Sequence, residues 1–171
     1  MPNQDGVFLP NEDTTFGADV TVTGTTTLAG ATTISGALTQ TGAVAGAAGI
    51  TSSSPTAGVG YATGAGGAVT QITSATTGVT LNAVTGTITT VALTNVAGID
   101  HTFVVTNSAV AATDVVVAHT QTYGGTADGI PIVNVQAVAA GSFTLNIRNT
   151  GAVALDALMT ISFAVIKGVA A

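Results

Sequence analysis

The sequence predicts an all-β protein built from an extended N-terminal arm, a short trimeric β-helical stem of hexad repeats and a C-terminal antiparallel β-sandwich head of the jelly-roll kind. Three observations support this prediction. Glycine recurs every six residues between residues 24 and 42. Runs rich in Val, Ile, Thr and Phe alternate with turn residues over the rest of the chain. No stretch combines a helical apolar period with helix-capping residues.

Residues 1–18 form an irregular arm whose apolar side chains have no local partner. The arm holds two of the chain's five Phe residues, and Pro2 and Pro10 discourage both a helix and a central strand. Exposed apolar clusters usually mark a partner surface. The predicted anchor residues are Val7, Phe8, Leu9 and Phe16. The alternative is that these side chains fold back on the base of the protein's own trimer.

Residues 19–50 form the stem, in which each hexad carries glycine, threonine and, in three of the four hexads, an aliphatic residue at a fixed place. The glycines are Gly24, Gly30, Gly36 and Gly42, and the aliphatic residues are Val22, Leu28 and Ile34. A β-helical coil takes about three hexads, and solenoids need at least about three repeats to share a core. A single chain with four hexads therefore barely completes one coil.

Three chains side by side would supply the missing walls of the stem. Val22, Leu28 and Ile34 would then share a common axis, and symmetric closure would remove exposed strand edges. A fibrous homotrimer is the favoured interpretation. A monomeric solenoid and a disordered Thr/Gly linker are the alternatives.

The polar linker TSSSPTAG (51–58) leads to the head, residues 59–171. Strands are expected near 68–74, 78–82, 86–94, 99–107, 114–119, 130–139, 142–149 and 159–167. Alternation is clean in SFTLNIRN (142–149), where Phe143, Leu145 and Ile147 share one face. The segment DVVVAH (114–119) is apolar on both faces, so it suits a central strand or a strand buried by a neighbouring subunit. Short strands in this number suit an antiparallel sandwich.

The composition excludes several functional classes. Charged residues make up 6% of the chain, and Arg148 and Lys167 are its only basic residues, against eight carboxylates. A nucleic-acid partner is not expected, because phosphate binding needs several Lys or Arg side chains. No cysteine is present, so disulfides and Cys-based zinc sites are excluded. The apolar run 157–166 is about half as long as a membrane span, and no membrane partner is expected.

Residues that could support catalysis are few. The glycine-rich segment YATGAGG (61–67) lacks the Lys-Ser/Thr of a phosphate-binding loop and predicts a turn that permits close approach. His101 and His119, near Asp100 and Asp114, could form a metal or acid–base pair, but polar rim residues are the simpler interpretation. With few carboxylates, two tyrosines and no Trp, polysaccharide cleavage is not expected. We therefore predict a protein that is not an enzyme, with no catalytic residues, metal site or cofactor.

Four segments of the head resemble a domain of tailed-bacteriophage virion proteins, described as head fibres, head decoration proteins or short tail-fibre-like proteins. They are GYATGAGGAVTQITSATTGVTLNAVTGTIT (60–89), TNSAVAATDVVVAH (106–119), VAAGSFTLNIRN (138–149) and FAVIKG (163–168). The resemblance covers most of residues 59–171. It implies a homotrimer that is attached to a particle by its N-terminal arm and displays the head outward, with no catalytic motif to carry over.

The resemblance implies a virion protein but does not distinguish a position on the capsid from one on the tail. The favoured prediction is a structural virion protein that decorates a bacteriophage capsid. Its partners would be the major capsid protein or another virion protein, and it would be assembled in the host bacterial cytoplasm. The alternative is a receptor-binding tail fibre or spike protein with a ligand on the bacterial surface. A stem of four hexads is short for reaching a host, which favours capsid decoration.

The stem hypothesis predicts the effect of Leu28→Asp. This substitution would place three like charges on an apolar axis and should splay the three chains, while the head keeps its own strands. Thermal melting of the trimer, followed with light scattering, measures the effect. A variant trimer that melts like the wild type would show that Leu28 does not face the axis.

Overall fold

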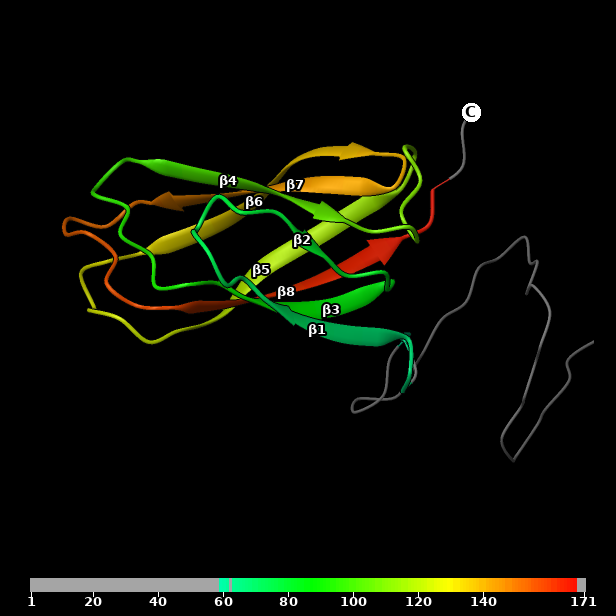
Figure 1. Ribbon diagram of the computed structural model, residues 1–171, viewed down its shortest axis with the longest axis horizontal. Coiled ribbons are helices and arrows are strands. Elements are labelled where there is room, and N and C mark those ends of the chain that lie inside the picture. Colours follow the sequence, from blue (N-terminus) through cyan, green and yellow to red (C-terminus); the bar gives the residue numbers. More distant parts are fainter. Residues whose placement is uncertain (1–58, 62, 169–171) are drawn as a thin grey trace, which may run out of the picture. The chain divides into compact units, whose positions relative to one another are not determined.

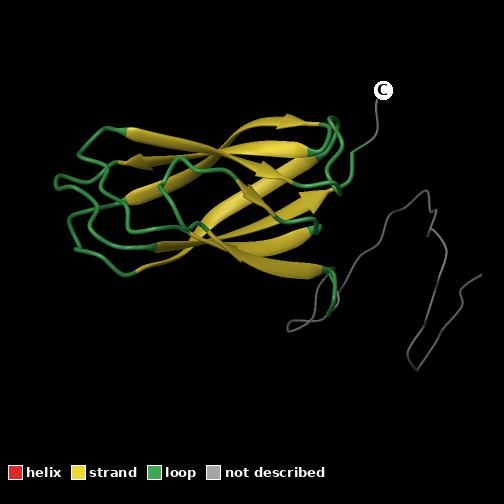
Figure 2. Cartoon of the chain, in the orientation of Figure 1, coloured by secondary structure: helices red, strands yellow, loops and turns green. Residues whose placement is uncertain are grey.

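The computed structural model describes residues 59–61 and 63–168, which fall in the second of the two units of the chain, Ile50–Ala171. The arm, the stem and the linker at 51–58 lie outside the described residues. The described part is all-β and contains only strands and loops (Figure 2). Among these residues, no helix that could cross a membrane occurs.

The head is a β-sandwich of two four-stranded sheets (Figure 1). The strands are β1 (Gly66–Thr70), β2 (Val79–Thr80), β3 (Thr85–Thr89), β4 (Asp100–Thr106), β5 (Val115–Tyr123), β6 (Pro131–Ala139), β7 (Ser142–Asn149) and β8 (Met159–Ile166). The first sheet has the order β1-β3-β8-β5, and the second has the order β2-β4-β7-β6. The all-β expectation and the sandwich are thereby confirmed.

Each expected strand segment overlaps an observed strand, and 142–149 matches β7 residue for residue. The expected strand 86–94 is too long, because β3 ends at Thr89. Beyond it the chain leaves the sheet, and the Leu93 amide donates to the Ala157 carbonyl of another loop. The apolar pattern of the sequence extends beyond the end of β3 because Leu93, although it lies in a loop, is fully buried.

The expectation of purely antiparallel, jelly-roll-like pairing is wrong, because both sheets are mixed. Strand β1 pairs with β3 in parallel, and β2 pairs with β4 in parallel. The strand between the members of each parallel pair belongs to the other sheet. The chain therefore crosses the sandwich and returns to its own sheet in the original direction.

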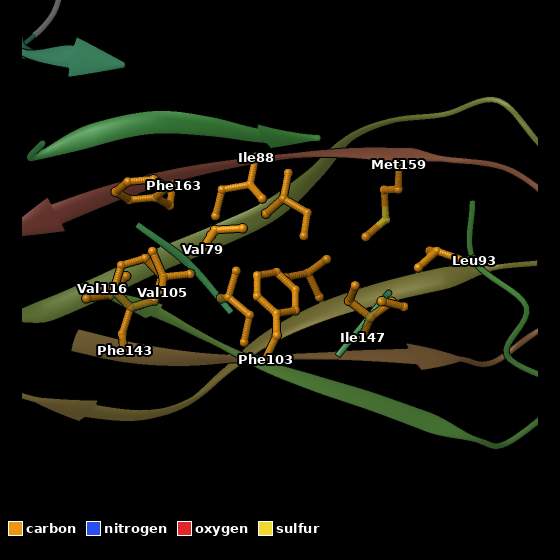
Figure 3. Close-up of a cluster of buried hydrophobic side chains, with 14 of the residues drawn as sticks. Val79, Ile88, Leu93, Phe103, Val105, Val116, Phe143, Ile147, Met159 and Phe163 are labelled. Carbon is orange, nitrogen blue, oxygen red and sulfur yellow. The ribbon is translucent and has the colours of Figure 1, made fainter. Parts of the chain in front are cut away.

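The core lies between the two sheets, and β7 and β8 each contribute several of its buried side chains (Figure 3). Every second side chain of each strand points inward and is buried. Phe143 of β7 and Phe163 of β8 meet across the core, with ring centroids 5.1 Å apart at 55°. Tilted contacts of this kind add to the area-based gain from burying aromatic rings.

The sandwich has two distinct ends. Gly66 pairs with Thr85, which pairs with Ala164, so β1 begins at the end where β8 finishes. We call this the proximal end, because the described chain both starts and finishes there (Figure 1). Loops 90–99, 124–130 and 150–158 lie together at the opposite end, which we call the distal end.

The glycine-rich segment holds a turn at Thr63 and Gly64, followed by the close-packed strand β1. Gly64 has a φ of 94°, a conformation that favours glycine. A Cβ on Gly67 would lie 2.7 Å from Leu81 Cδ1, and one on Gly86 would lie 2.7 Å from the Gly67 carbonyl oxygen. The turn is therefore present, with close packing inside the chain, and the expected close approach of separate chains stays a prediction.

Gly86→Ala tests this close approach. The added methyl group would contact the Gly67 backbone, which cannot move aside as a side chain can, so we expect a loss of about 1–3 kcal/mol of unfolding free energy. Gly124→Ala is the matched control, since a Cβ there meets nothing within 4 Å. Urea denaturation measures both variants. Equal midpoints would contradict the packing described for β1 and β3.

Candidate functional site

The predicted site residues all precede the described part of the chain. The predicted anchor residues are Val7, Phe8, Leu9 and Phe16, and the predicted stem-axis residues are Val22, Leu28 and Ile34. These assignments stay predictions. The structure instead shows which side chains the head exposes on its surface.

The His and Asp residues considered for a metal or acid–base pair do not come together. His101 lies on β4 of one sheet with its Nδ1 atom buried, whereas His119 is exposed on β5 of the other sheet. Across residues 59–61 and 63–168, no group of three or more His, Cys, Asp or Glu side chains could hold a metal ion. No pocket is found in the same residues.

Both basic side chains of the protein pair with aspartates of the same chain. Arg148 Nη1 lies 3.5 Å from Asp100 Oδ2, across the β4–β7 pairing. Lys167 Nζ donates to Asp114 and to the Ala109 carbonyl. Among the described residues, each of the two basic side chains therefore has an acidic partner in the same chain.

Asp114 fixes the loop before β5 to the end of β8 at the proximal end. Its Oδ2 atom accepts from the Ala111 amide at 2.8 Å and from Lys167, and its Oδ1 atom accepts from the Gly168 amide at 3.0 Å. The Ala111 amide and then Lys167 lower the pKa of this carboxyl group from 3.8 to about 2. The carboxylate is buried and both of its oxygen atoms accept hydrogen bonds, so it is a structural group.

Asn149 joins the three distal loops. Its Nδ2 group donates to the carbonyls of Asn95 and Val153, and its Oδ1 atom accepts from the amides of Ile130 and Gly151. The side chain is fully buried at the end of β7. One amide therefore uses its full hydrogen-bonding capacity to hold three loops together.

A second link at the distal end connects Tyr123 and Asp156. The Tyr123 hydroxyl donates to Asp156 Oδ1 at 3.0 Å, and the Asp156 amide donates back to that hydroxyl. Partial burial raises the pKa of the Tyr123 phenol. Neither link was predicted from the sequence, although the position of Asn149 on the apolar face of its strand, just before Thr-Gly, indicates a buried polar group.

The distal loops expose several large apolar side chains. They are Val96, Ile99, Ile130, Val153 and Leu158, and we call them the distal surface. Asp128 and Asp156 are the carboxylates of the same loops. Because Asn149 and Asp156 fix the loop backbones, this surface is presented in one arrangement and could bind a partner without prior ordering.

Segment 114–119 was expected to be either a central strand or a strand buried by a neighbouring subunit. Strand β5, which contains most of it, is not a central strand. It is an edge strand of the first sheet that pairs with β8 alone, and β6 of the other sheet lies beside it. Val116 points into the core, whereas Val115 and Val117 point outward and are 56% and 51% exposed. The remaining alternative, burial of this strand by a neighbouring subunit, stays open.

Comparison of the chain with protein families, curated proteins and solved structures found no match.

The environment of Asp114 predicts a pH-dependent stability. Its folded-state pKa is depressed, so its contribution is complete above the unfolded value and is lost as the pH falls from about 4 towards about 2. Asp114→Asn should therefore be less stable than the wild type near neutral pH, with a smaller difference at about pH 2.5.

Urea midpoints at several pH values measure this effect. Asp128→Asn, at an exposed aspartate of the distal loops, is the matched control. A stability difference between Asp114→Asn and wild type that does not change with pH would contradict the assignment.

Proposed function

We propose that the protein is a structural virion component: a trimeric head fibre or decoration protein attached to a bacteriophage capsid through its N-terminal arm. The observation that carries this proposal is the order of parts along the chain. An apolar arm and a hexad repeat precede a sandwich that the chain joins at its proximal end. The rigid distal loops lie at the opposite end, where a displayed module would expose them.

The surface chemistry of the head supports a structural role. The described residues contain no metal-binding cluster and no pocket, and the two basic side chains of the chain are paired with aspartates. The surface consists mainly of hydroxyl groups, amides and small apolar groups. Such a surface provides no long-range steering, and a trimer that stays attached to its particle needs none.

The arm supplies the attachment in this proposal. Burying one large apolar side chain fully contributes roughly 1.5–3 kcal/mol. Each chain offers Val7, Phe8, Leu9 and Phe16. Three arms on one trimer act at a high effective concentration, so modest single contacts add up to lasting attachment.

The alternative is a receptor-binding tail fibre or spike protein that touches the bacterial surface. The distal surface favours it, because exposed apolar side chains on fixed loops suit a binding face. The two functions differ in where the protein sits on the particle. A low-resolution image showing density on the capsid supports decoration, and density on the tail supports the alternative.

The arm hypothesis predicts the behaviour of a double variant, Phe8→Ala with Phe16→Ala. It should form a folded trimer that no longer co-sediments with particles, because the anchor has lost its two aromatic side chains. Val96→Ala with Ile99→Ala, on the distal surface, is the matched control and should co-sediment normally.

Two results would contradict this prediction. Unchanged particle binding by the arm variant would place the anchor elsewhere in the chain. A failure to trimerise would assign these phenylalanines to the base of the trimer itself.

A further inference from the structure

An apolar patch lies on the outward face of the first sheet, at its proximal end. The register places Val115 opposite Ile166 and Val117 opposite Ala164. Val115, Val117 and Ile166 are each more than half exposed. We call Val115, Val117, Ala164 and Ile166 the β5–β8 patch. Their side chains are adjacent because directly opposed residues of an antiparallel pair have Cβ atoms about 4.5–5.5 Å apart.

The rest of this sheet face consists of small or polar side chains and carries no Asp, Glu, Lys or Arg on its strands. Beyond the patch, the outward positions of β8, β3 and β1 are Ser162, Thr160, Thr85, Thr87, Thr89, Gly66, Ala68 and Thr70, with His119, Gln121 and Thr122 on β5. The outward face of the other sheet, in contrast, carries Asp100 and Arg148. Depletion of charged residues is a feature of the buried centre of protein interfaces.

The edge of β5 that faces away from β8 is not open along its length. β6 of the other sheet lies beside β5, and the Thr120 hydroxyl donates to the Pro131 carbonyl. The irregularity of β5 lies between Thr120 and Thr122, towards the distal end, so the part that carries Val115 and Val117 is regular. The surface that β5 offers to another chain is therefore its outward face, where these two side chains lie.

We infer that the β5–β8 patch packs against a second copy of the head, and this inference rests on the trimer of the proposed function. The path of the chain selects this occupant. The Tyr61 hydroxyl donates to the Val165 carbonyl, so the side chain of Tyr61, near the start of the described chain, reaches β8 beside Ile166. Three joined stems would bring three proximal ends together, and with them three copies of the patch.

The size of the patch agrees with a contact that depends on the stem. Four side chains bury far less than the roughly 1,000 Å² expected of a stable free-standing interface. Covalent connection to a trimeric stem raises the effective concentration of the heads, so a small apolar contact suffices. The distal surface lies at the opposite end and would stay free for other partners.

Single cysteine variants of the full chain test the inference, because the protein has no cysteine of its own. Val117→Cys reports on the patch. Val104→Cys is the matched control, since Val104 is 45% exposed at an outward position of β4 in the other sheet. We expect maleimide to modify Cys at 117 at least about tenfold more slowly than Cys at 104. This factor corresponds to a site that is open to the reagent in about a tenth of the molecules or fewer.

Light scattering on the same samples separates the outcomes. A trimer mass with slow modification at position 117 alone supports the inference. A trimer mass with equal rates overturns it and leaves the trimer intact, because the heads would then be independent. A monomer mass overturns the proposed trimer. Slow modification in a monomer would mean that residues 1–58 of the same chain cover the patch, which also overturns the inference.

Discussion

The head depends on one contact, the packing of the inward faces of β7 and β8 across the sandwich. These strands hold interior places in their two sheets, and their buried side chains include Phe143, Ile147, Ile161 and Phe163. The remaining strands pair with them directly or through one neighbour. Because only 6% of the residues are charged, ion pairs add little, and burial of apolar surface is the dominant favourable term.

The ends of these central strands also carry the polar groups that organise the loops. Asn149 ends β7 and holds the distal loops through four hydrogen bonds. Lys167 follows β8 and reaches Asp114 at the proximal end. Buried amides and carboxylates are costly unless they are satisfied, and a satisfied group fixes its partners in one arrangement. The loop surfaces therefore have defined shapes although they contain little regular structure.

Much of the fold could be predicted from the period-two pattern, because alternation reports which side chains are buried. It identified β7 in full and located all eight strands. Alternation does not report which strand lies beside which, so the parallel pairs and the edge position of β5 were not predictable. Nor does it identify Asn149 as a fully bonded group, since that depends on backbone atoms of three loops. The predicted anchor and stem residues lie outside the described part and stay predictions.

The low charge of the protein and the exposed β5–β8 patch have one joint consequence. A free monomer with few charges and an exposed apolar sheet face risks uncontrolled association, because charge repulsion is what usually opposes it. If a stem held the copies together, as we propose, the same face would meet a defined neighbour first. Val115, Val117 and Ile166 lie at the proximal end, where such a neighbour would be held. The position of the patch along the sheet therefore agrees with the end of the head at which the copies would be joined.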